Sequence, residues 1–202
     1  MKPDTRNAPL ELWRTAGAFI QILFDLFGEP QRIASLRVFE TAQRALALTW
    51  IRAGEWLVRE LLLIEAALLG PLPEPARRAK QTKTREKTPP LRRYHSFNPD
   101  DWRVSFQAIP TSRTTKSKSA RRFMPRDHYG AWPLAQRCEA LLRVYNNPLA
   151  YAKRLARRLF AKPARIALLR KHDPDAEYKV GPNGAAAIVA AADKAAGAFD
   201  SS

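Results

Sequence analysis

The chain has 202 residues, 46% of them hydrophobic, and a formal net charge of +16. These values exclude a fully disordered protein, because there is enough apolar side chain to form a core. The single cysteine, Cys138, excludes a small secreted scaffold held together by disulfides and favours a reducing compartment, the cytoplasm. Few glycines and 16 prolines favour helices separated by proline breaks, so the expected fold class is all-α.

The positive charge is concentrated in the middle of the chain. Residues 1–70 are neutral overall, residues 71–126 carry +11, residues 127–172 carry +8, and residues 173–202 carry −3. Such asymmetry indicates an anionic partner, either nucleic acid or an acidic lipid surface. We expect these basic side chains to face solvent, whereas the front of the chain supplies the apolar helices.

Residues 10–27 are predicted to form a helix that is buried over most of its circumference. Apolar side chains outnumber polar ones heavily, and the few polar residues recur at helical spacing as one stripe. Gly28 and Pro30 are expected to end this helix. It forms the first arm of a helical hairpin predicted over residues 1–70.

The second arm is predicted to be one long helix from Gln31 to Leu69, where apolar residues recur at steps of three and four. Two ion pairs at i,i+4 spacing are expected on its surface, Glu40–Arg44 and Glu55–Arg59. A helix of this length is about 55 Å long, so the first arm can cover only its first half. Residues 53–69 therefore need a cover, either the C-terminal helices or a second copy of the chain in a homo-oligomer.

Residues 71–131 are predicted to be a basic, Pro-rich linker that is mostly irregular. The part from 71 to 126 has eight prolines and no glycine, a composition that cannot bury enough surface to offset the cost of ordering it. We expect the following basic side chains of the linker to contact a polyanion: Arg77, Arg78, Lys80, Lys83, Arg85, Lys87, Arg92, Arg93, Lys116, Lys118, Arg121 and Arg122.

Residues 94–109 differ from the rest of the linker because they keep large apolar side chains. Asn98-Pro99-Asp100 favours a turn, and the alternation that follows predicts a short strand-like segment. Such a segment does not order alone, so we expect it to dock on the long helix or on a partner. The docking side chains are Phe97, Trp102, Val104, Phe106 and Ile109. An isolated hydrophobic stretch, or stacking of the aromatic rings on single-stranded bases, is the alternative.

Residues 132–172 are predicted to form short basic helices, interrupted at Asn147-Pro148, where Asn147 can cap a helix and Pro148 can begin one. The helix that follows is amphipathic, with apolar residues on one side and four cations on the other: Lys153, Arg154, Arg157 and Arg158. Pro163 restarts a short helix. Residues 173–202 predict an Ala-rich tail helix, weakly anchored because it has few large side chains.

No stretch of the sequence carries a catalytic, metal-binding or cofactor-binding signature. The three histidines, His95, His128 and His172, are too widely separated for the short paired spacings of a zinc site. Cys138 is expected to pack as a small apolar residue, although a nucleophilic thiol paired with His128 is an alternative. We infer no cofactor, no metal and no small-molecule substrate.

These patterns predict a non-enzymatic interaction protein that contacts a polyanion, nucleic acid, through its basic linker and its basic helix. One alternative is a peripheral membrane protein whose interfacial face comprises Phe19, Ile20, Leu23, Phe24 and Phe27. Another is a homo-oligomeric scaffold with a linker that only confers solubility, and a third is an enzyme whose site is assembled from dispersed residues.

Overall fold

The computed structural model describes residues 6–36, 40–73, 98–109, 131–170 and 174–200. Across these ranges the chain is helical and contains no strand, which confirms the all-α class. The α-helices are α1 (Leu10–Phe27), α2 (Pro30–Ser35), α3 (Thr41–Leu69), α4 (Trp132–Asn146), α5 (Pro148–Ala161), α6 (Ile166–Leu169), α7 (Pro174–Val180) and α8 (Pro182–Asp200). Two 3₁₀ turns, η1 (Pro99–Asp101) and η4 (Pro163–Arg165), lie between them.

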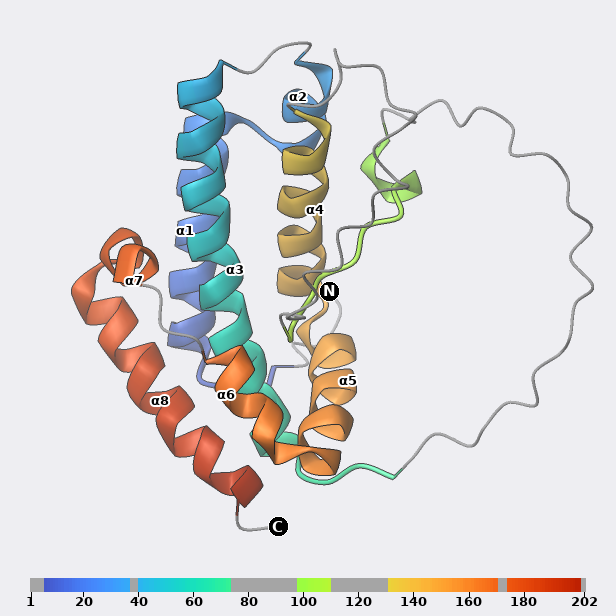
Figure 1. Ribbon diagram of the computed structural model, residues 1–202, viewed down its shortest axis with the longest axis vertical. Helices are drawn as coiled ribbons and strands as arrows, with labels where there is room; N and C mark the ends of the chain where they lie inside the picture. The colour runs from blue at the N-terminus through green and yellow to red at the C-terminus, as the bar shows by residue number, and fades with distance from the viewer. Residues whose placement is uncertain (1–5, 37–39, 74–97, 110–130, 171–173, 201–202) are drawn as a thin grey trace, which may run out of the picture.

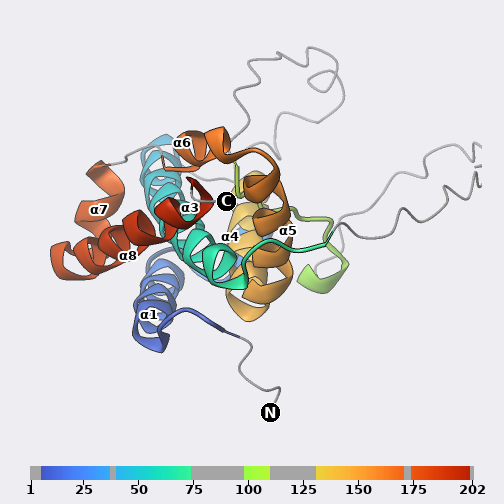
Figure 2. The same cartoon turned by 90° about the horizontal axis from the view of Figure 1, so that it is seen from below.

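Helix α3 is the centre of the bundle. It packs against α1, α4, α5, α7 and α8, and Figure 2 shows these helices arranged around it. Between Ile51 and Ala66 nearly all its side chains are buried, whereas most of those between Thr41 and Leu46 are exposed. The C-terminal helices thus supply the cover that the second half of α3 requires.

The predicted hairpin forms, but its second arm is interrupted. α1 runs from Leu10 to Phe27 as predicted, and Gly28, at φ 89°, ends it in a conformation that favours glycine. The prediction of one helix from residue 31 to residue 69 is wrong, because α2 ends at Ser35 and the next residue, Leu36, has an extended backbone. α2 packs on α4 with Ile33 buried, whereas α3 lies against α1. The periodic spacing of apolar residues indicates that α2 and α3 each have a buried side. It does not indicate that the two helices pack on different neighbours.

The two ion pairs expected on the second arm have different outcomes. Glu55 and Arg59 form their pair at 3.0 Å. Glu40 precedes the first residue of α3, and no ion pair joins it to Arg44 in the part of the chain that the structure describes.

Three of the C-terminal helices in the described residues, α5, α7 and α8, begin at prolines, and Pro148 opens α5 as the sequence predicts. Asn147 precedes it, but its side chain accepts no capping hydrogen bond. α8 is anchored more firmly than we expected, since Phe199 at its end is buried and packs on Phe160 with ring centroids 4.6 Å apart. Its buried residues follow steps of three and four: Ala185, Ile188, Ala192, Ala195 and Phe199. Small alanines let α8 approach α3 closely, so few large side chains are needed.

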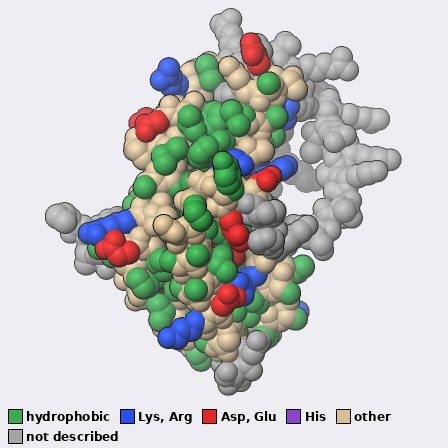
Figure 3. Space-filling view, turned by 90° about the vertical axis from the view of Figure 1, so that its left-hand side faces the viewer, with side chains coloured by type: hydrophobic (Ala, Val, Ile, Leu, Met, Phe, Trp, Pro, Cys, Tyr) green, Lys and Arg blue, Asp and Glu red, His purple; other side chains and the backbone are tan. Residues whose placement is uncertain are grey.

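One face of the bundle carries exposed apolar side chains. In Figure 3 hydrophobic side chains gather over the part of this face formed by α1 and the first half of α3. The large exposed apolar residues of these segments include Ile22, Leu26 and Leu46. None of the described helices is both long enough and apolar enough to cross a lipid bilayer.

Candidate functional site

The basic face of α5 comprises Lys153, Arg154, Arg157 and Arg158. Lys153, Arg154 and Arg158 are exposed, and Arg157 is half-buried. The opposite side of the helix is buried in the core through Ala152, Leu155, Ala156 and Leu159. Because these apolar residues pack against α3, the exposed cations of α5 face away from the core. In Figure 1 α5 lies to the right of α3 and α8 to its left.

Within the described residues, none of these four cations is paired with a carboxylate. The guanidinium of Arg154 lies over the ring of Tyr151, 5.0 Å from its centroid. The buried Nε of Arg157 has no hydrogen-bond partner in the described part of the chain. α5 contains no acidic residue, so the face keeps its full positive charge.

Other arginines form ion pairs with carboxylates inside the bundle. Arg59 and Arg137 both contact Glu55, Arg143 pairs with Glu139 at 2.6 Å, and Arg170 pairs with Asp193 at 2.5 Å and with Glu60 at 3.6 Å. Some cations of residues 127–172 therefore form ion pairs inside the bundle, and others, those of α5, do not. This corrects the expectation that these basic side chains face solvent. Arg137 of α4 and Arg170 after α6 form ion pairs with other helices, whereas no carboxylate of the described residues pairs with the cations of α5.

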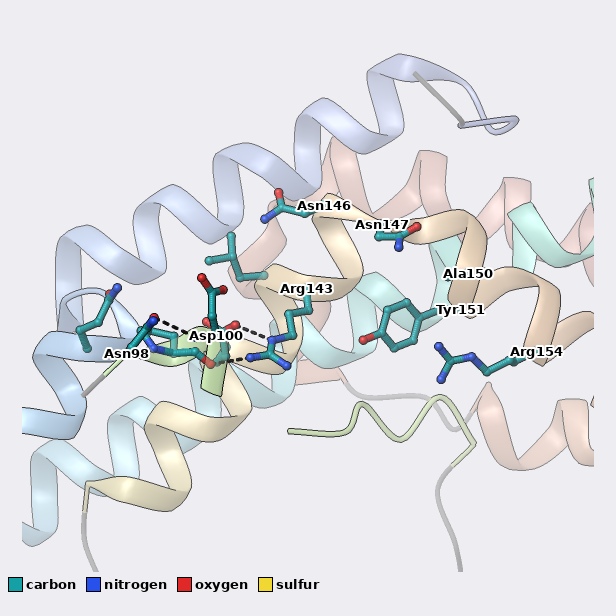
Figure 4. A pocket seen from close by; sticks show the side chains of 12 residues that line it. Asn98, Asp100, Arg143, Asn146, Asn147, Ala150, Tyr151 and Arg154 are labelled. Atoms are coloured by element: carbon teal, nitrogen blue, oxygen red, sulfur yellow. Dashed lines mark hydrogen bonds and ion pairs between the residues drawn. The ribbon is translucent and has the colours of Figure 1, made fainter. Parts of the chain in front are cut away.

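A polar pocket of about 460 Å³ adjoins one end of the basic face, between η1, α4 and α5 (Figure 4). Arg143 points into the turn at η1, where it donates to the carbonyl oxygen of Pro99 as well as to Glu139. Tyr151 and Arg154 line the α5 end of the pocket. Glu139 pairs with Arg143, and Asp100 also lines the pocket without an ion pair to Arg154 among the described residues, so the pocket adds hydrogen-bonding groups at this end of the basic face.

The predicted docking side chains lie against α4 and α5. Trp102 is buried and its ring centroid lies 4.6 Å from that of Trp132, while Phe106 meets Tyr151 edge-on at 6.5 Å. Val104 and Ile109 are half-buried against the same core. Residues 102–107 run without a neighbouring strand, so the strand-like pattern forms no ladder. Phe97 lies outside the described residues.

The Asn98-Pro99-Asp100 turn forms as predicted. It is the 3₁₀ turn η1, and the side chain of Asn98 accepts a hydrogen bond from the backbone N–H of Asp100 at 3.1 Å.

The linker cations expected at a polyanion interface lie outside the described residues. They are Arg77, Arg78, Lys80, Lys83, Arg85, Lys87, Arg92, Arg93, Lys116, Lys118, Arg121 and Arg122. The three histidines also lie outside the described residues. Of the side chains predicted to contact a polyanion, only the four cations of the basic face of α5 lie within the described residues.

Cys138 is fully buried on α4, and burial raises the pKa of its thiol to about 12. A thiol in this state is a small apolar side chain and a poor nucleophile at neutral pH. The described residues contain no group of three His, Cys, Asp or Glu side chains that could hold a metal ion.

Three glutamates of α3 were not singled out from the sequence. Glu55 is half-buried, and Glu60 and Glu65 are buried in the core with exposed fractions of 2% and 0%. Burial raises the pKa of Glu60 to about 7, and the guanidinium of Arg170 acts in the opposite direction. The signal was available, because these are acids at intervals of five in an otherwise apolar run.

Comparison of the chain with protein-family models, with curated proteins and with solved structures finds no match. A functional assignment therefore rests on the residues of this chain alone.

Proposed function

We propose that the chain is a non-enzymatic helical interaction protein that contacts a polyanion, nucleic acid, through the basic face of α5. The observation that carries this proposal is the contrast between two sets of cations. Arg59, Arg137, Arg143 and Arg170 are matched by carboxylates, whereas the four cations of the basic face have no carboxylate partner in the described structure.

Unpaired cations on a rigid helix suit a phosphate backbone. Each phosphate that they neutralise releases condensed counterions, which gives affinity that does not depend on sequence and falls steeply with salt. Arginine adds a planar fork of donors that matches phosphate oxygens. The cations of residues 77–93 and 113–126 extend the same proposal along the chain, as additional charge in the segments that precede α4.

A peripheral membrane function has less support. Phe19, Ile20 and Leu23, which would form its interfacial face, are buried in the core of the bundle. The basic face of α5 would then have to bind acidic lipid by charge alone, and stable membrane anchoring generally takes a second signal.

The proposal is tested with the full chain and two charge-matched triple variants. Lys153→Gln, Arg154→Gln, Arg158→Gln removes the exposed cations of the basic face and leaves half-buried Arg157 in place. Arg32→Gln, Arg44→Gln, Arg52→Gln removes three exposed cations from α2 and α3. Binding to fluorescent duplex and single-stranded DNA is measured by anisotropy across a salt series, and flotation with neutral and acidic liposomes is measured in parallel.

We expect DNA affinity to fall steeply between about 50 and 200 mM salt, and the α5 variant to lower the slope of log K against log salt by about two to three. The α2/α3 variant should keep most of the affinity of the wild-type chain. Equal losses in both variants, or no DNA binding at low salt, would contradict the proposal. Flotation with acidic liposomes without DNA binding would favour the membrane function.

A homo-oligomeric scaffold is a second candidate, supported by the exposed apolar residues Ile22, Leu26 and Leu46 on α1 and α3. Contiguous apolar patches on the surface of soluble proteins commonly mark interaction sites, and Figure 3 shows hydrophobic side chains gathered over α1 and the first half of α3. Sedimentation equilibrium tests it, since a mass that rises with concentration in the wild type and not in Leu26→Glu supports self-association. A monomer at every concentration removes this candidate.

A further inference from the structure

A second pocket, of about 530 Å³, lies between α3, α4 and the segment that follows η1. Its lining includes three arginines, Arg59, Arg103 and Arg137, and one carboxylate, Glu55. None of its lining residues belongs to α5, so it is separate from the basic face. The charges that line it do not balance.

Two guanidinium groups share the carboxylate of Glu55. Arg137 donates from Nε to Oε1 at 2.7 Å and from Nη2 to Oε2 at 2.9 Å, and Arg59 donates from Nη2 to the same Oε2 at 3.0 Å. All three side chains are largely withdrawn from water, with exposed fractions of 31%, 19% and 16% for Arg137, Arg59 and Glu55. One negative charge therefore stands against two positive charges in a partly buried setting.

Arg103 adds a third positive charge at the rim, where its side chain is exposed and has no carboxylate partner in the described structure. Burial lowers the pKa of Arg59; Glu55 opposes this effect, and the charge of Arg137 adds to it. The negative charge of Glu55 therefore does not fully offset the burial of the Arg59 guanidinium and the positive charge of Arg137. The lining carries an excess of two positive charges that a bound anion would neutralise.

We infer that this pocket binds a small phosphate ester, with the phosphate between Arg59, Arg103 and Arg137. A phosphate monoester carries a charge of about −1.5 to −2 at pH 7, which matches the excess. Guanidinium groups bind such oxyanions through paired donors, which Arg103 can offer. Arg59 and Arg137 already donate to Glu55 and contribute mainly their positive charge. Val104, Phe106 and Pro133 also line the pocket and provide an apolar wall for the organic part of the ligand.

The inference does not depend on the nucleic-acid proposal, because the two sites share no residue. It is tested by isothermal titration of the full chain with phenyl phosphate, inorganic phosphate and benzoate, at constant ionic strength set with sodium chloride. Phenyl phosphate carries both the dianion and an apolar ring. Inorganic phosphate lacks the ring, and benzoate lacks the second charge.

We expect saturable binding of phenyl phosphate, weaker binding of inorganic phosphate, and the weakest binding of benzoate. Arg103→Gln should weaken phenyl phosphate about tenfold, the loss of one charge-assisted hydrogen bond. Since Arg103 makes no ion pair with a described residue, this variant keeps the Glu55 pairs intact. Arg32→Gln and the α5 triple variant should bind phenyl phosphate like the wild type.

Absence of saturable phenyl phosphate binding would overturn the inference, and so would unchanged affinity in Arg103→Gln. Equal binding of benzoate and phenyl phosphate would show that the site does not select a dianion, and would overturn the choice of a phosphate ester. Loss of phenyl phosphate binding in the α5 variant would place the anion on the basic face instead. DNA binding and phenyl phosphate binding are tested with variants at different residues. The failure of one proposal therefore leaves the other unaffected.

Discussion

The indole Nε1 of Trp13 donates a 3.0 Å hydrogen bond to the carboxylate of Glu65, and both side chains are completely buried. The same carboxylate accepts from the backbone N–H groups of Asn7 and Ala8 at 3.0 and 3.1 Å. Arg6 lies over the rings of Trp13 and Tyr145. One glutamate therefore fastens the segment before α1 to the second half of α3.

Glu65→Ala should destabilise the protein strongly, because it leaves three buried or part-buried donors without an acceptor. We expect a loss of roughly 2–4 kcal/mol in the free energy of unfolding, and a smaller loss for Trp13→Phe, which removes one donor. Glu11→Ala is the control, since Glu11 is 75% exposed in its pair with Arg14. Urea denaturation measures all three, and a Glu65→Ala variant as stable as Glu11→Ala would contradict this role.

Glu60 should make the protein less stable as the pH rises. Its pKa is raised from 4.5 to about 7 by burial, with Asp193 acting in the same direction and Arg170 and Arg59 against it. Between these two values the folded chain holds a proton on Glu60 that the unfolded chain has released, so this contribution is present below pH 4.5 and is lost as the pH passes 7.

Glu60→Gln removes the titration while keeping the shape of the side chain. We expect the stability of the wild type relative to Glu60→Gln to fall by roughly 2–3 kcal/mol between about pH 5 and pH 8. Urea denaturation of both proteins at the two pH values measures this difference. A constant difference, or one that grows with pH, would show that Glu60 is ionised throughout.

Trp102 should hold the chain after η1 against α4. It is buried on Trp132, whereas the next residue, Arg103, is exposed. Replacing a buried Trp by Ala costs about 3–5 kcal/mol, which opens this segment locally before the bundle unfolds. We expect trypsin to cut after Arg103 at least about tenfold faster in Trp102→Ala than in the wild type, as followed by mass spectrometry. Leu168→Ala, at an exposed apolar site on α6, should leave that rate unchanged.

Cys138 should be unreactive in the folded protein. Its pKa of about 12 leaves almost no thiolate at pH 8, whereas an unfolded cysteine has a pKa near 8.5. We expect alkylation by iodoacetamide to be on the order of a thousandfold slower in native protein than in guanidinium chloride. The chain has one cysteine, so total labelling reports this site, and comparable rates in the two conditions would show that the thiol is accessible.

Hydrophobic periodicity and proline positions were enough to predict the helical class, the bounds of α1 and the start of α5. These features depend on neighbours close in the chain, which a sequence displays directly. The break between α2 and α3 depends on α2 packing on α4, about a hundred residues away in the chain, and periodicity carries no such information. The close packing of α8 was missed for a related reason, since alanines bury little area but allow backbones to approach.

The basic face of α5 was visible in the sequence because its four cations share one helix. The partners of the other arginines were not, since Arg137 reaches Glu55 across 82 positions of the chain. The net charge of a segment therefore overstated how many of its cations lack a carboxylate partner. The arginine-lined pocket beside Glu55 is also a product of tertiary packing, because α3, α4 and the segment after η1 meet there.

The three glutamates of α3 also bear on how the bundle assembles. Positions five apart on a helix differ in direction by about 140°, so Glu55, Glu60 and Glu65 point to different sides of α3. Each has its own partner. Glu55 accepts from Arg137 of α4, Glu60 forms a 3.6 Å ion pair with Arg170 after α6, and Glu65 accepts from the chain around Asn7 and Trp13. A neighbouring helix seated on the wrong side would bury a carboxylate with no donor, at a cost of several kcal/mol. The three glutamates thus contribute to the specificity of helix packing, because an incorrect arrangement of the helices would leave a buried carboxylate without its partner.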